Sequence, residues 1–385
     1  MKSIIIGGGI AGLATAIGLH KKGFDAAVYE AAPAFTPAGA GILLAPNGME
    51  VLKRTNMDLF HRVQQLGNQI TRLQVVTHTQ KKLAGADFKK DNLCYAIHRA
   101  ALIGALAEQL PPEALHTHKR FERFTEDFSG IKVSFEDGSQ ASGDFLVATD
   151  GIHSRVRAQL LGKLPYRYAQ QTCWRAIVPF KLPQGYQHTF TEMWGNEPGL
   201  RVGFGAIDNE HIYFFATYFT SAGGKDDPKS LKQDLLSIYK DFSPLVLDFI
   251  KTAQVANILR NDIYDLAPGN QWYRGRVALV GDAAHATTPN MGQGGNQALE
   301  SAWVFAGCMA KVVQQPQRLT TGFAQYQQQR LKKAHKVVKD SWRISQLVNL
   351  KSGIARGVRN LVMQHAPPRL AEANMKKVYA LEYDF

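Results

Sequence analysis

The sequence predicts an α/β fold with a parallel sheet flanked by helices, an inserted and mostly antiparallel sheet, and a helical C-terminal segment. Three observations support this prediction. Near residues 2–23, 143–162 and 275–313, a short apolar strand runs through a turn into a helical pattern, as in a βα unit. Residues 166–262 instead show the two-residue alternation of half-buried strands. The last 55 residues space their apolar groups as a helix does.

The domain organisation follows from this change of pattern along the chain. A chain of 385 residues can form two domains, or one large α/β domain that contains an inserted unit. We expect a discontinuous parallel-sheet domain, an inserted substrate domain and a C-terminal helical segment. Their predicted ranges are 1–70, 96–165 and 265–330 for the first, 71–95 and 166–264 for the second, and 331–385 for the third.

Cysteine usage and apolar runs indicate the compartment. Cys94, Cys173 and Cys308 are odd in number, far apart and not in a metal-binding spacing, which favours a reducing compartment. The N-terminal apolar stretch is interrupted by glycines and lacks a basic region and a cleavage site, so it does not read as a signal peptide. No apolar run reaches the length of a membrane span. We therefore expect a cytoplasmic protein without a metal site or a transmembrane segment.

Basic residues concentrate near the C-terminus. The chain has a net charge of +13, and residues 311–377 alone hold 14 Lys and Arg against Asp340 and Glu372, a net charge of +12. Such a segment forms a solvated helix face or contacts an anionic surface. We expect no nucleic-acid partner. Apolar groups at helical spacing predict that this tail packs against the rest of the protein; they are Val338, Trp342, Leu347, Val348, Leu361 and Val362.

The first strand–turn–helix unit carries a glycine motif. After the strand "KSIII", Gly7, Gly9 and Gly12 form G-x-G-x-x-G, and a helical pattern follows. In this context Gly7 permits a sharp turn, Gly9 lets a pyrophosphate approach the backbone, and Gly12 lets helix and strand pack closely. Glu30 ends the next strand, 18 residues after Gly12, where a carboxylate can bind both hydroxyls of an adenosine ribose. The motif predicts a dinucleotide site but does not distinguish FAD from NAD.

Two later corners repeat this design. The strand "FLVAT" leads into Asp150 and a basic helix start, and the strand "VALVG" leads into Asp282 and a second glycine segment. A capping Asp at a strand–helix corner is common by itself. His285 lies near Asp282, but the chain has no G-x-S-x-G nucleophile motif. We therefore expect His285 to be a hydrogen-bonding residue of the turn.

Together the three segments resemble a known family. "GGGIAG" at the start, "DGIHSRVR" in the middle and "GDAAHATTPNMGQGGNQALESA" late in the chain are similar to the signatures of the single-component FAD-dependent aromatic-ring monooxygenases, which include hydroxybenzoate and salicylate hydroxylases. The resemblance covers residues 1 to about 330. It implies a Rossmann-type FAD-binding domain of the glutathione reductase kind, in which both glycine segments hold one extended FAD.

The resemblance also implies roles for individual residues. Glu30 would hold the adenosine ribose, Arg99 would reach the phosphate and ribityl region, and Asp282 would accept a hydrogen bond from a ribityl hydroxyl. The segment that begins at Asp150 would serve both FAD and a transient nicotinamide. The backbone near the second glycine segment would lie against the flavin ring, where N–H groups and a helix dipole stabilise negative charge. The implied flavin-facing residues are Pro289, Gly292, Gly294, Gly295 and Asn296.

The inserted sheet offers candidate substrate residues. Arg201 and Tyr213 stand twelve residues apart, on the two arms of the expected hairpin "GLRVGFGAIDNEHIYFF". An arginine that faces a pocket can clamp an anion, and the spacing resembles that of bacterial FAD-dependent urate hydroxylases, which implies that both residues face the substrate. The alternative is an exposed strand arginine and a core tyrosine. Arg175, in "WRAIVP", is expected to be structural.

The resemblance implies an enzyme: an FAD-dependent monooxygenase that uses NADH or NADPH and O2. It would hydroxylate an electron-rich aromatic or heteroaromatic small molecule through a flavin hydroperoxide, with Arg201 and Tyr213 as the catalytic residues. Two alternatives on the same fold remain: an FAD-dependent reductase of a lipid-like substrate, and a non-catalytic flavin redox sensor that uses its basic tail. Product formation that depends on O2 separates the first hypothesis from the other two.

Overall fold

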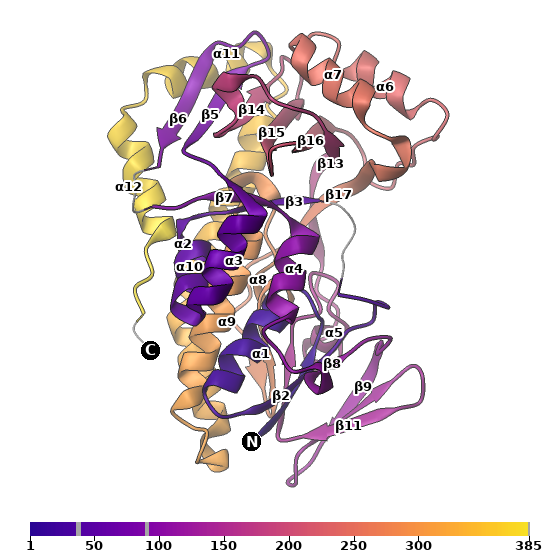
Figure 1. Cartoon of the computed structure of the whole chain (residues 1–385), viewed down its shortest axis with the longest axis vertical. Coiled ribbons are helices and arrows are strands. Elements are labelled where there is room, and N and C mark those ends of the chain that lie inside the picture. Colours follow the sequence, from indigo (N-terminus) through magenta and orange to yellow (C-terminus); the bar gives the residue numbers. More distant parts are fainter. Residues whose placement is uncertain (36–39, 89–91, 384–385) are drawn as a thin grey trace.

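The structure, a computed structural model, describes residues 1–35, 40–88 and 92–383, with the side chains of 368–372 and 374 left out. It is built around two large sheets (Figure 1). Residues 89–91 of the predicted substrate domain lie outside the described residues, as do residues 36–39 of the predicted parallel-sheet domain. Among the described helices, none combines the length and hydropathy needed to cross a membrane.

The first large sheet has six strands and is parallel except at one edge, where β18 pairs antiparallel with β19. Its order is β18 (Tyr273–Arg274), β19 (Val277–Leu279), β12 (Phe145–Ala148), β1 (Lys2–Ile6), β2 (Asp25–Tyr29) and β8 (Leu115–His116). The predicted parallel sheet is therefore confirmed. Apart from the first residues of β1 and β2, its central strands are apolar and buried because both faces are covered.

Different elements cover the two faces of this sheet. Ile5 packs on the face that holds the helices, and Ile4 on the opposite face. The helical face holds α1 (Ile10–Lys21), α2 (Pro46–Thr55), α3 (Met57–Leu66), α4 (Arg99–Ala107) and α9 (Gly294–Ala310). The opposite face holds α5 (Arg155–Leu161) and a three-stranded sheet of β9 (Phe121–Glu126), β10 (Ile131–Phe135) and β11 (Gln140–Gly143).

The second large sheet has seven strands and is mostly antiparallel, as predicted. Its order is β17 (Leu259–Leu266), β13 (Tyr166–Pro179), β16 (His211–Phe219), β15 (Arg201–Ala206), β14 (Thr189–Trp194), β5 (Arg72–Thr77) and β6 (Lys82–Asp87). The exception is β5, which pairs parallel with β14. Two helices that the sequence analysis did not anticipate, α6 (Leu231–Ile238) and α7 (Pro244–Thr252), cover its outer face.

A small sheet lies between the two large ones (Figure 1). It consists of β3 (Gly41–Leu44), β7 (Tyr95–His98) and β4 (Gly67–Gln69). The six-stranded sheet draws its strands from the predicted ranges of the first domain, and the seven-stranded sheet draws most of its length from those of the second. The domain boundaries themselves stay a prediction.

The C-terminal segment is helical, as expected, and consists of α10 (Leu319–Val348), α11 (Gly353–His365) and α12 (Pro368–Tyr379). Helix α10 packs against α9 and β13, and Val338 and Val348 are buried. The expectation of a core-facing stripe is nevertheless wrong for Leu347, Leu361 and Val362, which are all exposed. Helical periodicity locates an apolar face but does not say toward which side that face turns.

Candidate active site and family

One cavity of about 520 Å³ lies between the carboxyl edge of the six-stranded sheet and the inner face of the seven-stranded sheet. Such a volume is typical of small-molecule sites. The cavity is lined by residues of both glycine segments and by side chains of the inserted sheet. Of the predicted site residues, those that line it are Gly9, Arg99, Arg201, Tyr213, Asp282, Pro289, Gly292, Gly294 and Gly295. The remaining ones, which do not line it, are Gly7, Gly12, Glu30, Asp150 and Asn296.

The first glycine segment joins β1 to α1. Gly7 has a φ of +107°, and a Cβ there would lie 2.5 Å from the carbonyl oxygen of Thr149. A Cβ at Gly12 would lie 1.8 Å from the carbonyl oxygen of Gly7, so strand and helix approach very closely. At Gly9, by contrast, a Cβ would meet no atom of the described residues within 4 Å. Because α1 follows without a side-chain cap, its first N–H groups are available to an anionic group in the cavity.

Glu30 stands beside this segment, at the end of β2. Its Oε2 accepts a hydrogen bond from the Gly8 N–H at 2.6 Å, and its Oε1 accepts one from the Ala32 N–H at 2.8 Å. The two amides hold the carboxylate in place, and each oxygen keeps a lone pair for a further donor. This geometry fits the predicted contact with ribose hydroxyls.

We expect Glu30→Ala to weaken FAD binding by about 10- to 100-fold, because hydrogen bonds from hydroxyls to a charged group contribute about 1.5–3 kcal/mol. The measurement is the dissociation constant of FAD from flavin fluorescence on titration of the apoprotein. The control is Glu50→Ala, which removes an exposed carboxylate that pairs with Arg54 at 2.8 Å on α2. Equal affinities for the two variants would contradict the ribose-binding role of Glu30.

The second glycine segment lies beside the first. From β19 the chain passes through the short helix α8 (Asp282–His285) and a 3₁₀ turn at Pro289–Met291 into α9. Helix α9 begins at Gly294 without a side-chain cap, so its free N–H groups and the positive end of its dipole lie at the cavity wall. Both glycine segments therefore border the same cavity, as the resemblance implies.

Asn296 holds this wall from behind. The side chain is fully buried. Its Oδ1 accepts from the Ala45 N–H, and its Nδ2 donates to the carbonyl oxygens of Leu43 and Gly292, each at 2.9 Å. The amide thus fixes the end of β3 to the start of α9, and we propose a positioning role for it.

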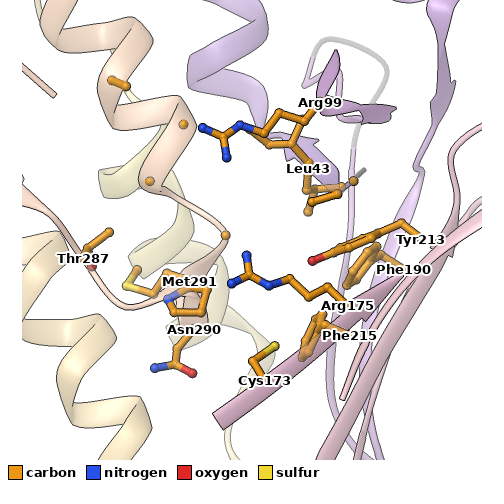
Figure 2. Close-up of a pocket in the computed structure, with 18 of the residues that line it drawn as sticks. Leu43, Arg99, Cys173, Arg175, Phe190, Tyr213, Phe215, Thr287, Asn290 and Met291 are labelled. Atoms are coloured by element: carbon orange, nitrogen blue, oxygen red, sulfur yellow. The ribbon is translucent and has the colours of Figure 1, made fainter. Parts of the chain in front are cut away.

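Arg99 and Asp282 add opposite charges to the cavity wall. Arg99 begins α4, and its guanidinium points into the cavity (Figure 2). Burial lowers the pKa of Arg99 and raises the pKa of Asp282, while the attraction between the two groups acts against both shifts. A cation and an anion at one wall suit a ligand that carries both phosphates and hydroxyls.

Asp150 caps helix α5 from the corner after β12. Its Oδ2 accepts from the N–H groups of Arg155 at 2.9 Å and Val156 at 3.2 Å. Its Oδ1 is buried and has no hydrogen-bond partner among the described residues. The neighbours Thr149 and Gly151 line the cavity. An unsatisfied acceptor at this point, next to the glycine segments, fits a ligand hydroxyl and supports the cofactor-binding role predicted for the segment.

The predicted hairpin is confirmed as β15 and β16. Arg201 pairs with Thr217, and Tyr213 pairs with Gly205, so both side chains lie on the cavity face, four residues apart along the strands. Figure 2 shows the Tyr213 hydroxyl pointing into the cavity. Burial raises the pKa of this phenol well above its usual value, so Tyr213 stays protonated and can donate a hydrogen bond.

Arg201 lines the cavity, but its charge is already balanced. Its two terminal nitrogens donate to Glu192 Oε1 at 3.1 Å and to Asn290 Oδ1 at 2.6 Å, and the side chain is only 1% exposed. Asn290 in turn donates to Ser345 Oγ at 2.6 Å. Arg201 therefore ties the hairpin to the loop before α9 and, through Asn290, to α10.

Arg175, which was expected to be structural, also lines the cavity. Its guanidinium reaches into the open space near Tyr213 (Figure 2). It donates a hydrogen bond to Asn261 Oδ1 at 3.2 Å, and its Nε has no hydrogen-bond partner among the described residues. It forms no ion pair with a described carboxylate. The alternation in "WRAIVP" could have predicted this position. It places the Arg175 side chain on the other face of the sheet from the buried Trp174 and Ala176.

His285 takes no part in the cavity wall. It lies against Trp272, with ring centroids 5.2 Å apart, and its Nε2 is 2.8 Å from Ser301 Oγ. Burial lowers the pKa of His285 to about 3, so the ring is neutral at physiological pH. These contacts agree with the expected local hydrogen-bonding role. Among the described residues, no group of His, Cys, Asp or Glu side chains could hold a metal ion.

Comparison with known proteins identifies the family. Residues 1–341 match the model of the FAD binding domain family. The chain is 33% identical over 367 residues to the aurachin C monooxygenase/isomerase of Stigmatella aurantiaca, covering 94% of this chain and 93% of the relative. It is 32% identical over 345 residues to the FAD-dependent urate hydroxylase of Klebsiella pneumoniae, covering 88% of each.

Solved structures agree with this result. The crystal structure of Klebsiella pneumoniae HpxO, complexed with FAD and uric acid, superposes with a TM-score of 0.89 at 28% sequence identity, covering 98% of this chain and 96% of that one. The cavity geometry, the unsatisfied donors and acceptors around it, and these similarities point to the same cofactor. The chain belongs to the FAD binding domain family and is an FAD-dependent hydroxylase of the flavoprotein monooxygenase group.

Proposed function

We propose that this protein uses NADH or NADPH and O2 to hydroxylate an electron-rich aromatic or heteroaromatic small molecule that carries an acidic oxygen on its ring. The observation that carries the proposal is the construction of the cavity. One wall is formed by the two glycine segments, and the opposite wall presents the Tyr213 hydroxyl and the Arg175 guanidinium. The relatives named for urate and aurachin C support the substrate class.

FAD, when bound and reduced, activates O2 and supplies an electrophilic oxygen atom. One atom of O2 enters the ring as a hydroxyl, the other leaves as water, and the nicotinamide provides the two electrons. The residues that would hold FAD include Glu30, Arg99, Asp150, Asp282 and the backbone at Gly9; Pro289, Gly292, Gly294 and Gly295 would lie beside its ring.

The protein orients the substrate and excludes water. Leu43, Phe190, Phe215 and Met291 line the space between the two walls, and such side chains suit a flat ring and keep water from the reacting atoms. Tyr213 can donate a hydrogen bond to a ring oxygen. A guanidinium stabilises that oxygen as an anion, which raises the electron density of the ring that is to be attacked.

The test is aerobic oxidation of NADH and NADPH by the FAD-loaded protein, with and without urate, hydroxybenzoates, salicylate, hydroxyquinolines and polycyclic phenols. We expect at least one compound to accelerate the oxidation and to yield a product that has gained one atom of oxygen from O2. Hydrogen peroxide as the sole product would mean that the compound stimulates NAD(P)H oxidation but is not itself the substrate that is hydroxylated. A product formed equally well without O2 would overturn the proposal in favour of a reductase.

The contacts of the two cavity arginines predict different roles. We expect Arg175→Met to raise the KM of the hydroxylated substrate about 10- to 100-fold, because a hydrogen bond to a charged group contributes about 1.5–3 kcal/mol. FAD affinity should not change. We expect Arg201→Met to remove the hydrogen bonds to Glu192 Oε1 and Asn290 Oδ1, and hence to lower the product formed per NAD(P)H consumed as the loop before α9 shifts.

Steady-state kinetics, product yield and FAD content of both variants separate these outcomes. The matched control is Arg260→Met, an arginine of the same sheet that pairs with Asp226 at 3.0 Å and does not line the cavity. If Arg201→Met raised only KM and Arg175→Met changed nothing, the predicted role of Arg201 as the anion clamp would be supported and that of Arg175 refuted.

A further inference from the structure

Helix α11 turns its apolar side to the solvent and its polar side to the rest of the protein. Four of its large apolar residues face outward: Ile354 is 84% exposed, Val358 55%, Leu361 58% and Val362 62%. This spacing of four, three and one residues places them on one stripe of the helix. The only side chain of α11 that is buried is Arg359. A helix on the surface of a protein ordinarily turns the opposite way.

The inward face of α11 is well anchored, so this orientation is not that of a loose helix. The Arg359 guanidinium lies 4.5 Å from the centre of the Trp194 ring and donates to the Leu347 carbonyl oxygen at 2.9 Å. Met363, one turn further on, packs against the cluster of Leu83 and Trp194. The contacts fix the outward direction of the apolar stripe.

This stripe forms what we call the α11 face: Ile354, Val358, Leu361 and Val362. Ten large hydrophobic side chains are markedly exposed among the described residues, and four of them belong to this face. Apolar side chains gathered in this way mark a contact surface, whereas single exposed ones do not.

The positive charge near the α11 face favours an anionic partner. Residues 341–371 contain no Asp or Glu and five Lys and Arg, of which Arg359 faces inward and Arg343 pairs with Asp340. Lys351 stands exposed directly before the helix. A second copy of the chain, related by twofold symmetry, would bring two such positive segments together. A surface of anionic lipid headgroups complements the charge and also accepts apolar side chains.

We propose that the α11 face binds a lipid surface that carries anionic headgroups. Helix α11 would lie in the plane of that surface, with its apolar stripe at the boundary between headgroups and acyl chains and with the flanking cations at the headgroups. The position of the face permits such contact, because α11 lies at the end of the molecule formed by the seven-stranded sheet and packs on its edge strand β6 (Figure 1). The proposal does not depend on which substrate the cavity accepts.

The test is co-sedimentation of the FAD-loaded full chain with vesicles of pure phosphatidylcholine and with vesicles of equimolar phosphatidylcholine and phosphatidylglycerol. We expect binding to the second kind only, and weaker binding at high salt. The double variant Ile354→Gln/Leu361→Gln should lower the partition coefficient at least about tenfold, since two apolar side chains no longer enter the surface. Lys351→Glu should lower it about fivefold or more.

The matched control is Phe128→Gln, which removes an apolar side chain that is 96% exposed elsewhere on the protein. It should bind vesicles as the unmodified chain does. FAD content and melting temperature should be unchanged in every variant, because all the altered side chains are exposed. Equal binding to both kinds of vesicle, or no loss in the double variant, would overturn the proposal. A dimer that the double variant dissociates, seen by light scattering, would assign the face to a second copy instead.

Discussion

Gly12→Ala is expected to yield a protein that does not retain FAD and that is strongly destabilised. The Cβ of an alanine would lie 1.8 Å from the Gly7 carbonyl oxygen and 2.8 Å from Thr149 Oγ1. Backbone atoms and a buried side chain cannot move aside without separating α1 from β1, so we expect a loss of several kcal/mol, at the upper end of single substitutions. FAD content after purification and the urea midpoint of unfolding are the measurements.

Two other glycines serve as controls for this result. At Gly104, inside α4, a Cβ would meet no atom of the described residues within 4 Å, and Gly104→Ala should stabilise the protein by about 0.5–1 kcal/mol. Gly9→Ala also has room within the protein, but its methyl group would project into the cavity. It should fold normally and bind FAD more weakly. If Gly12→Ala behaved like Gly104→Ala, the close approach of strand and helix would be wrong.

Arg330→Met is expected to lower the free energy of unfolding by about 3–5 kcal/mol, the usual effect of removing one partner of a buried ion pair. Arg330 and Glu300 are both fully buried, 2.5 Å apart. Arg330 also donates to Gln297 Oε1 at 2.6 Å and to the Tyr383 hydroxyl at 3.3 Å. The substitution removes a hydrogen-bond donor from Gln297 Oε1 and a cation from the buried Glu300 carboxylate. Glu300 then keeps its ion pair with Lys333. Chemical denaturation measures the effect.

Arg343→Met provides the comparison on the same helix. Arg343 is exposed and pairs with Asp340 at 3.1 Å, and exposed pairs of this kind contribute about 0–1 kcal/mol. A similar loss of stability in the two variants would show that the buried pair contributes no more than a surface one. A large loss confined to Arg330→Met would confirm that the buried pair of Arg330 and Glu300 stabilises the fold.

The sequence predicted best what is local. The G-x-G-x-x-G unit, the corner at Asp150 and the Arg201–Tyr213 hairpin each depend on residues within about twenty positions of one another. They occur in the structure where the pattern placed them. Local signals suffice for them because a turn and its flanking strand or helix form from neighbouring residues.

What the sequence did not predict depends on distant partners. The balanced charge of Arg201 requires Asn290, 89 residues away, and the parallel pairing of β14 with β5 joins residues more than a hundred positions apart. The outward turn of α11 is set by Arg359 and its contact with Trp194. The periodicity of a sequence shows which residues share one face of a helix. It does not show whether that face packs against the protein or points to the solvent.

Arg175 and Arg201 differ in how strongly their side chains are bonded to the rest of the protein. This difference has a consequence for how substrate preference can change over evolutionary time. Arg175 forms no ion pair with a carboxylate of the described residues and donates a hydrogen bond to the Asn261 side chain, so many other residues could replace it without disturbing the fold. Arg201 is tied to Glu192 and, through Asn290, to the segment that precedes α9. If these two arginines contact the substrate as proposed, a new specificity arises at lower cost at Arg175, whereas a change at Arg201 requires compensating changes at Glu192 and Asn290.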